Sequence, residues 1–265
     1  MDLGLEGKVA LVTGGSKGIG RAVAAGLARE RARVAVVARR AELLERAARE
    51  IGDQTGGEIA AFPGDMINPE DVTRVVAAVV ARFGRIDVLV NNAGAAPGGL
   101  MLNLTEDDWQ LALQGKFLGY VRCMRAVIPH MLRAGGGRIV NVVGNDGVKP
   151  TYLELTPSAA NAADLAVTQA LAEQYGKHRI LINAVNPGPV STDRWEGLVR
   201  GYARDKGISV EEAARRAAQS IPLGRFATPE EVADVVVFVA SERASFMNGA
   251  LITLDGGQRK AIMDT

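Results

Sequence analysis

The chain has 265 residues, with 31 Lys and Arg against 30 Asp and Glu. This length suits one large globular domain, and the near-neutral charge offers no electrostatic footprint for a nucleic acid partner. Cys123 is the single cysteine, which excludes an internal disulfide, and His130 and His178 are not placed to form a metal site. No signal peptide and no apolar run of ~20 residues is evident in the sequence. We therefore expect a cytoplasmic protein without a bound metal or a membrane partner.

Short runs rich in β-branched residues alternate with segments of helical apolar spacing. The predicted strands follow one another at 8–14, 33–38, 58–62, 86–91, 138–143, 180–186 and 250–254. Helices are expected at about 19–31, 41–51, 69–83, 106–132 and 158–175, with one more before the last strand. Near-continuous apolar strands separated by helices are typical of a parallel sheet that is covered on both faces. The sequence predicts a single α/β domain over residues 1–265, a doubly wound parallel sheet of about seven strands.

Two helix starts are marked by their capping residues, and one long segment is irregular. Asn68-Pro-Glu-Asp71 and Thr228-Pro-Glu-Glu231 each combine an N-cap, a proline at the first helical position and acids in the first turn. Residues 191–225 carry Trp195, Tyr202 and many charges on short helical patterns. This segment is either a lid over a substrate pocket or a solvated excursion.

A glycine-rich loop, Thr13-Gly-Gly-Ser-Lys-Gly-Ile-Gly20, joins the first strand to the first helix. Glycines permit a tight turn and let a pyrophosphate approach the helix N-terminus, where free N–H groups and the helix dipole favour negative charge. By itself the loop is also compatible with a simple tight turn. Its place in a strand-loop-helix unit favours dinucleotide binding.

In these motifs the chain resembles the short-chain dehydrogenase/reductase family over almost its whole length. The glycine loop resembles the family's TGxxxGIG, Asn91-Asn-Ala-Gly94 its NNAG element, Asn186-Pro-Gly188 its PG motif, and Leu254-Asp-Gly-Gly257 its C-terminal strand ending. The resemblance implies a Rossmann fold and a bound dinucleotide. It assigns cofactor contacts to Gly14, Ser16, Lys17, Gly18, Ile19, Gly20, Asp65, Asn91, Ala93, Gly94, Asn161, Pro187, Gly188 and Thr192.

The end of the second strand indicates which dinucleotide is preferred. An acid there binds the adenosine ribose hydroxyls, whereas a base accepts a 2′-phosphate. This chain has Ala38-Arg-Arg40 at that point and Lys17 in the glycine loop, with no acid. NADP(H) is therefore expected, with Arg39 as a ligand, although these bases could also be solvated helix-terminal charges.

The four catalytic positions of the family are all occupied by other residues. The resemblance implies an Asn in a proton relay, a Ser that orients the substrate carbonyl, a Tyr that acts as general acid and a Lys that binds the nicotinamide ribose. At these positions the chain has Lys116, Gly144, Pro157 and Asn161, respectively. Thr156 and Pro157 would make a good N-cap and first residue for the following helix. Loss of a general acid costs roughly 10²–10⁴ in rate, so another group must act if the chain is a reductase.

Nearby residues supply candidates for that group: Lys116, Asp146, Tyr152 and Glu154. Lys116 is expected to enter the active-site region from its helix, where a partly buried amine could act as an acid. The alternative is that it forms an ion pair with Asp146 or Glu154. Tyr152 either donates a proton or packs.

These features leave three functions open. The first is an NADP(H)-dependent oxidoreductase with an atypical active site and a small organic substrate. The second is a non-redox lyase, cyclase or isomerase, and the third is an inactive NADP(H)-binding sensor or partner subunit. For the oxidoreductase, an iminium or another electrophile that arrives charged, or one activated as a Schiff base on Lys116, suits a site without the usual donors.

Homo-oligomerisation, as a tetramer, is expected because the family resemblance extends through the helices at 106–132 and 158–175. Ala162, Leu165, Ala166 and Leu171 would otherwise leave one helix face partly exposed, unless other parts of the chain cover them.

Overall fold

The computed structural model describes residues 1–94, 96–152 and 154–258. Seven parallel strands form one sheet in the order β3-β2-β1-β4-β5-β6-β7, which confirms the predicted doubly wound arrangement. The strands are β1 (Val9–Thr13), β2 (Arg33–Ala38), β3 (Ile59–Pro63), β4 (Val88–Asn91), β5 (Gly137–Val142), β6 (Ile180–Pro187) and β7 (Leu251–Leu254). The chain reverses its direction of travel across the sheet between β1 and β4, which opens a crevice at the carboxyl ends of these strands.

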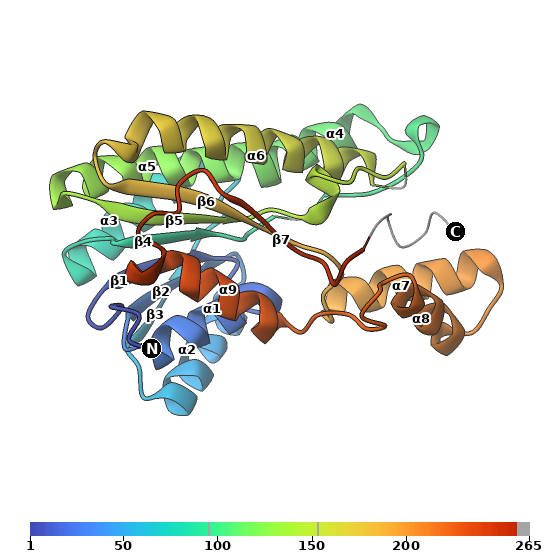
Figure 1. Cartoon of the computed structure of the whole chain (residues 1–265), viewed down its shortest axis with the longest axis horizontal. Coiled ribbons are helices and arrows are strands. Elements are labelled where there is room, and N and C mark those ends of the chain that lie inside the picture. Colours follow the sequence, from blue (N-terminus) through green and yellow to red (C-terminus); the bar gives the residue numbers. More distant parts are fainter. Residues whose placement is uncertain (95, 153, 259–265) are drawn as a thin grey trace.

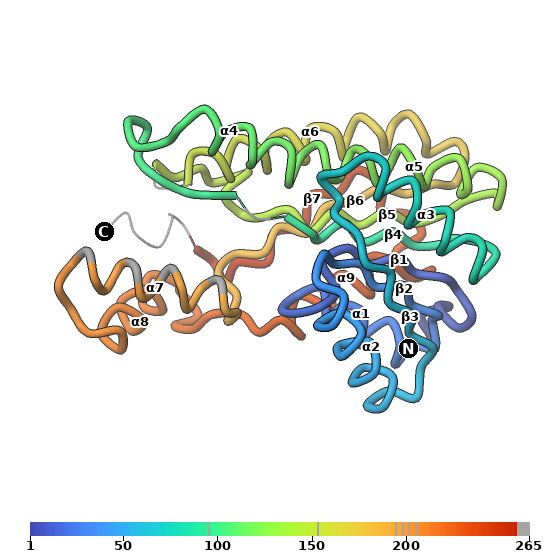
Figure 2. Tube along the Cα trace, turned by 180° about the vertical axis from the view of Figure 1, so that it is seen from behind, coloured from blue at the N-terminus to red at the C-terminus, as the bar shows by residue number. Residues whose placement is uncertain are grey.

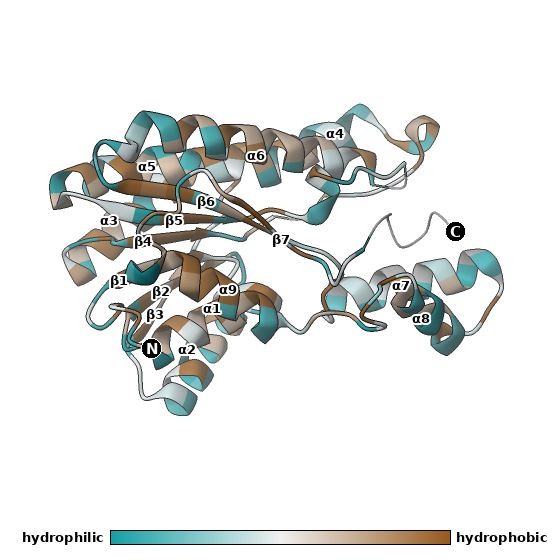
Figure 3. Ribbon diagram, in the orientation of Figure 1, coloured by the Kyte–Doolittle hydropathy of each residue, from teal (hydrophilic) through white to brown (hydrophobic). Residues whose placement is uncertain are grey.

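Helices cover both faces of this sheet (Figure 1). One layer contains α3 (Pro69–Phe83), α4 (Glu106–Ala112), α5 (Leu118–Ala134) and α6 (Leu155–Gly176), and the other contains α1 (Gly18–Arg29), α2 (Ala41–Thr55) and α9 (Pro229–Ala240). Four short turns are η1 (Met101–Asn103), η2 (Leu113–Phe117), η3 (Asn145–Gly147) and η4 (Glu242–Ala244). Figure 3 shows hydrophobic residues concentrated on the strands, whereas the helices are more hydrophilic on their outer sides.

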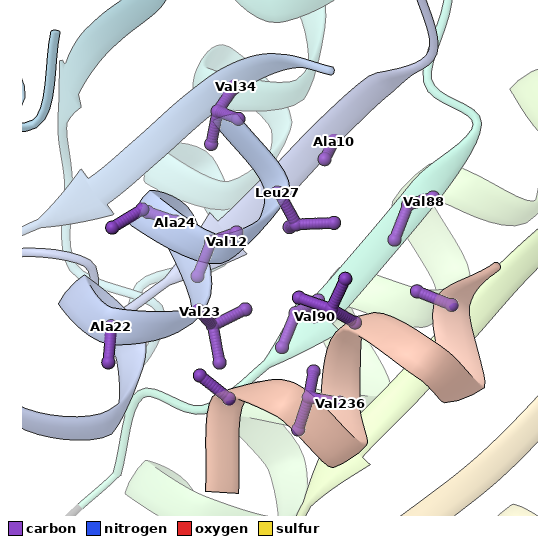
Figure 4. Packing of buried hydrophobic residues seen from close by; sticks show 14 of the residues in the cluster. Ala10, Val12, Ala22, Val23, Ala24, Leu27, Val34, Val88, Val90 and Val236 are labelled. Atoms are coloured by element: carbon purple, nitrogen blue, oxygen red, sulfur yellow. The ribbon is translucent and has the colours of Figure 1, made fainter. Parts of the chain in front are cut away.

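The core consists of two main clusters, one on each face of the sheet. Because successive side chains of a strand point to opposite faces, Leu11 and Val12 of β1 belong to different clusters. Figure 4 shows the cluster on one face, where Val23 of α1 and Val236 of α9 lie near Val90 of β4. Burial of this apolar surface stabilises the fold by roughly 25 cal/mol per Å². It thereby holds the strand ends that build the site in place.

Both predicted helix starts are confirmed. The Asn68 side chain accepts hydrogen bonds from the backbone N–H groups of Glu70 and Asp71 at the start of α3. Thr228 and Glu231 form a complete capping box at the start of α9. Each cap satisfies backbone donors that have no partner inside the helix.

The prediction of a single helix over 106–132 was wrong, because a turn interrupts the segment. A π-helical turn, η2, separates α4 from α5 and contains Lys116. A π-turn widens the helix by one residue and is frequently found at functional sites. Here it brings Lys116 into the protein interior, where its residue exposure is 5%.

The predicted start of the next helix was also wrong. Helix α6 begins at Leu155, with Glu154 at the N-cap position and no side-chain cap. Thr156 lies inside the first turn, and its hydroxyl donates to the carbonyl oxygen of Pro97 instead. Pro157 is tolerated there because the first backbone N–H groups of a helix lack intrahelical acceptors.

Two helices, α7 (Asp193–Lys206) and α8 (Val210–Gln219), project from the end of the sheet where the strands finish. Seen from behind in Figure 2, they form a separate lobe beside the carboxyl ends of the strands. A small cluster holds the lobe together, with the rings of Trp195 and Phe226 5.4 Å apart and Val199 and Ala203 buried beside them. The segment 191–225 therefore has an apolar interior of its own.

Candidate active site

A cavity of about 1360 Å³ opens at the carboxyl ends of the central strands, in the crevice between β1 and β4. It continues past β5 and β6 to α7, so the projecting lobe forms one of its walls. Most of the sequence-predicted site residues meet there. These are Gly14, Ser16, Lys17, Gly18, Ile19, Arg39, Asp65, Ala93, Gly94, Lys116, Gly144, Asp146, Tyr152, Glu154, Asn161, Pro187, Gly188 and Thr192.

Gly20, Asn91 and Pro157 are not part of this lining. A Cβ on Gly20 would lie 2.4 Å from the carbonyl oxygen of Gly14, so this glycine permits the loop to pack on its own helix. Asn91 is completely buried, and its amide donates to Asn141 over 2.9 Å, which joins β4 to β5. The next residue, Asn92, lines the cavity instead and was missed by the sequence analysis.

The glycine loop is tied to the loop that follows β4. The Thr13 hydroxyl accepts hydrogen bonds from the backbone N–H groups of Asn92 and Ala93 at 2.9 and 3.0 Å, and the Asn92 amide donates to the Thr13 carbonyl. Gly14 has φ +72°, and a Cβ there would lie 2.7 Å from the Asn92 amide nitrogen. The loop therefore brings bare backbone to the N-terminus of α1, a geometry that fits a pyrophosphate.

Three bases line the outer end of the cavity: Lys17, Arg39 and Arg40. The Lys17 amine lies 3.2 Å from the Asp193 carboxylate on α7, and both side chains are mostly exposed. Asp65 lies on the neighbouring wall, where its carboxylate accepts from the Ile67 N–H. The positive charge at the end of β2 fits a 2′-phosphate better than a pair of ribose hydroxyls.

The inner end of the cavity contains an amine, that of Lys116, against the amide of Asn161. Lys116 Nζ donates to the Val143 carbonyl oxygen over 2.7 Å and also to Asn161 Oδ1. Lys116 comes from η2 and Asn161 from α6, so the two elements meet through this bond.

This arrangement leaves no room for a side chain at Gly144. The Asn161 amide nitrogen donates to Asp146 Oδ1 over 2.7 Å, and a Cβ on Gly144 would lie 2.6 Å from each of these two atoms. Gly144 also has φ +155°, where a side chain is strained. A serine at this position would displace the bond between Asn161 and Asp146. Pro157 is buried outside the lining.

The other candidate acids and donors lie at different depths. Asp146 is linked to Lys116 through the amide of Asn161. Tyr152 lies at the cavity rim with 54% of the residue exposed, while Glu154 is half-buried in the wall. Lys116 is therefore the candidate donor with the most defined position.

A second network ties the cavity wall to the end of the chain. Lys149 Nζ lies 2.6 Å from Asp255 Oδ2, which also accepts from the Asn145 amide over 3.0 Å, and Gln258 lies against the same groups. Sequence reasoning missed this network because its two halves are more than 100 residues apart. It fixes the loop after β5 against the segment that follows β7.

Asp164 was also missed. It lies on α6 one turn beyond Asn161, its residue exposure is 1%, and both carboxylate oxygens lack a hydrogen-bond partner within the described residues. Burial raises the pKa of Asp164 to about 7, and the charge of Lys116 opposes that rise. The available signal was an acid inside the apolar run Ala162-Ala-Asp-Leu-Ala166.

Cys123 and His130 lie outside the cavity lining. Cys123 is buried, and burial raises the pKa of its thiol to about 12, which suppresses the reactive thiolate. The ring of His130 hydrogen-bonds Arg133 on the exposed side of α5. Across the part of the chain that the structure describes, His, Cys, Asp and Glu side chains form no metal-binding group, and no helix is long and apolar enough to cross a membrane.

Comparison with known proteins gives the chain a family. The family profile described as enoyl-(acyl carrier protein) reductase matches residues 14–259. A 3-oxoacyl-[acyl-carrier-protein] reductase from Thermotoga maritima is 34% identical over 96% of this chain and 98% of its own length. The chain belongs to the short-chain dehydrogenase/reductase family. Another member, the D-threitol dehydrogenase of Mycolicibacterium smegmatis, is 36% identical over 97% of this chain and 94% of its own length.

Solved structures of family members have the same fold. The L-sorbose reductase of Gluconobacter frateurii, in complex with NADPH and L-sorbose, superposes with a TM-score of 0.93 at 35% identity, covering 97% of this chain and 98% of that one. An actinorhodin polyketide ketoreductase with NADPH gives a TM-score of 0.92 at 33% identity, covering 95% and 97%. The cavity of this chain therefore belongs to a fold that other members use for nucleotide-dependent reduction.

Proposed function

We propose that this protein is an NADP(H)-dependent oxidoreductase that reduces a small organic substrate through an atypical active site. The glycine loop at the start of α1, the bases at the end of β2 and the NADPH-bound relatives support this assignment. The observation that carries it is the position of Lys116, whose amine lies in the cavity against Asn161 Oδ1.

The cofactor is NADP(H), and the cavity offers each of its parts a suitable partner. Gly14 and Gly18 leave room for the pyrophosphate at the helix N-terminus, and Lys17 and Arg39 hold the 2′-phosphate. Asn161 and Thr192 line the nicotinamide end. When bound, NADPH supplies the hydride that reduces the substrate.

Lys116 supplies the proton that the missing tyrosine would have given. Its ammonium group is held in the cavity by the Val143 carbonyl and the Asn161 amide oxygen, where a substrate oxygen can approach it. Reduction of a carbonyl develops negative charge on that oxygen, and a fixed cation nearby stabilises it. Asn161 positions the amine, and Asp146 in turn positions Asn161.

The amine acts as an acid rather than as a covalent catalyst. If a substrate formed an imine with Lys116, reduction of that imine would leave a stable secondary amine on the enzyme and turnover would stop. A proton donor regains its proton from solvent after each cycle. The Schiff-base route considered from the sequence is therefore not retained.

The remaining parts of the proposal concern the surroundings of the site. Residues 191–225 act as a lid, because the lobe that they form supplies Trp195 and Tyr202 to the cavity wall. The protein works as a homotetramer. It works in the cytoplasm, since its buried free cysteine is compatible with a reducing compartment.

The test compares two substrate types with the same carbon skeleton, a ketone and a cyclic iminium ion, in the wild-type protein and in Lys116→Met. NADPH oxidation and product mass are followed together under anaerobic conditions. A ketone needs a proton on oxygen, whereas reduction of an iminium ion neutralises an existing charge. We therefore expect Lys116→Met to slow ketone reduction by roughly 10²–10⁴ and to spare iminium reduction. Lys177→Met, an exposed lysine beyond α6, is the matched control.

Other outcomes lead to other functions. An equal loss with both substrates would contradict proton donation by Lys116. Product without NADPH oxidation would favour the lyase, cyclase or isomerase alternative. Tight NADPH binding without any product from the substrate panel would favour the sensor or partner-subunit alternative.

A further inference from the structure

Asp164 lies behind the amine that the proposed function uses. It is on α6 one helical turn after Asn161, and its side chain is shielded from solvent. Its neighbours' hydrogen bonds go elsewhere: the Tyr120 hydroxyl donates to the Val142 carbonyl, and the Thr168 hydroxyl donates to the backbone oxygen of Asp164. Within the described residues, the carboxylate oxygens receive no hydrogen bond. A buried carboxylate with no donor is costly unless a charge compensates it.

The compensating charge comes from η2. The ammonium group of Lys116 is the cation that acts on Asp164 and lowers its pKa against the effect of burial. On α5, burial and, to a lesser extent, the charge of Asp164 raise the pKa of the Tyr120 phenol. A protonated tyrosine carries no charge, so Tyr120 does not compensate the carboxylate.

Within the part of the chain that the structure describes, the remaining elements around Asp164 supply no second cation to it. Asp146 on η3 is an acid and is engaged by the Asn161 amide. On α4, Glu106 and Asp107 are exposed, and Asp108 caps its own helix. Arg138 lies near the start of β5, where burial lowers its pKa and Glu242 opposes that shift. Strand β6 contains no ionisable residue. Above about pH 7, where Asp164 ionises, Lys116 and Asp164 thus form a pair of opposite charges behind the cavity.

We propose that Asp164 is a positioning residue that serves as the buried counter-charge of Lys116 and keeps its amine in the ammonium form. The inference rests on the proposed function for its catalytic meaning, but the charge coupling itself can be measured without turnover. Burial alone would favour the neutral amine, which can neither donate a proton nor stabilise a negative oxygen. An ionised Asp164 opposes this effect, because a nearby anion favours the protonated amine. After the amine has given up a proton, the same anion favours its reprotonation.

The coupling is tested by measuring the pKa of Lys116 directly. The protein is labelled with ¹³C at lysine Cε, and the Lys116 resonance is identified by its loss in Lys116→Met. Its pH titration is then compared in the wild-type protein, in Asp164→Asn and in Asp234→Asn, which removes an exposed acid on α9. We expect Asp164→Asn to lower the pKa of Lys116 by about one unit, a tenfold change in its proton dissociation constant, and the control to leave it unchanged. Asp164→Ala provides a second variant without an amide.

A Lys116 pKa in both Asp164 variants equal to that of the control would overturn the proposal. Activity gives a second, separate readout: the alkaline limb of kcat/KM for ketone reduction should move to lower pH in Asp164→Asn by the same tenfold factor in proton concentration. A shifted pKa without turnover in any of the proteins would support the charge pair and contradict the proposed reductase. A shifted pKa with an unmoved alkaline limb would support the pair and contradict proton donation by Lys116.

Discussion

Lys116 and Asn161 are the residues on which the chemistry of the site depends. A hydrogen bond joins them inside the cavity. Gly144 is compatible with this bond because the space of a side chain there is filled by Asn161 and Asp146. Lys116, Asn161 and Asp146 are therefore coupled to one another through direct contacts.

The buried carboxyl of Asp164 should affect stability as well as chemistry. Its folded-state pKa is raised from 3.8 to about 7, so between these values the folded chain holds a proton that the unfolded chain releases. Stability therefore falls as pH rises through this window. Relative to Asp164→Asn, the wild-type protein should lose about 1.4 kcal/mol of unfolding free energy per pH unit.

Urea titrations of both proteins at several values within this window check that slope. The difference in unfolding free energy between the two proteins at each pH cancels the contributions of the titratable groups that they share. A constant difference in unfolding free energy across the window would contradict a raised Asp164 pKa.

Arg39 is the residue expected to distinguish NADPH from NADH. It follows β2 and lines the cavity, where its guanidinium group would make charge-assisted hydrogen bonds to a 2′-phosphate. Such bonds contribute about 1.5–3 kcal/mol, so Arg39→Asp should weaken NADPH binding roughly tenfold to a hundredfold and leave NADH binding much less affected. Titration calorimetry with both reduced cofactors measures this.

Arg46→Asp is the matched control for the cofactor experiment, because it makes the same charge change on the exposed side of α2. Equal or tighter binding of NADH than of NADPH by the wild-type protein would refute the expected preference.

At the scale of elements, helix ends decide how the cavity walls are built. The η2 turn interrupts what the apolar spacing indicated as one helix, and it is this turn that brings Lys116 inward. Helix α6 starts without a side-chain cap because Thr156 is used to bind the loop at Pro97. Helix α9 shows the contrasting case, with a complete capping box formed by Thr228 and Glu231.

Thr228→Ala should destabilise the protein by about 1 kcal/mol, since the Glu231 N–H loses its acceptor at the start of α9. Thr228→Ser keeps the hydroxyl and should stay near the wild-type stability.

The bonds from Arg225 and from the Thr228 backbone lower the pKa of Glu231 to about 2. These bonds therefore stabilise the folded protein above pH 4.5, the usual pKa of a glutamate, and their stabilisation is lost as the pH falls towards 2. Thermal unfolding of the three proteins at neutral and acidic pH measures both effects, and equal stability of Thr228→Ala and Thr228→Ser would contradict the capping argument.

At the scale of the whole molecule, the expected assembly uses the helix layer that contains α5 and α6. For Leu165 on this face the alternative of cover by the chain itself holds, because it is buried against Val143 and Ala184. Ala162 and Ala166 remain exposed on α6. Small side chains on an exposed face let a second helix approach closely.

Light scattering at micromolar concentration should report a homotetramer, and Ala166→Arg should reduce it to smaller species because a large charged side chain blocks close approach. Gln54→Arg is the control, because Gln54 is exposed at the end of α2, away from this layer. A monomeric wild-type protein, or an unchanged mass for Ala166→Arg, would contradict this assembly.

The sequence by itself determined the order of the strands and helices, the glycine loop and the bases after β2. These depend on local patterns: apolar periodicity, caps and glycines are all read over a few neighbouring residues. The departure of Lys116, Gly144, Pro157 and Asn161 from the family pattern stays a prediction from the sequence. Only the tertiary structure decided what replaces the pattern, because the Lys116–Asn161 bond and the link from Lys149 to Asp255 join residues 45 and 106 positions apart. The role of Asp164 depends on the same kind of contact: a carboxyl inside an apolar helix acquires its charge partner only when η2 packs against α6.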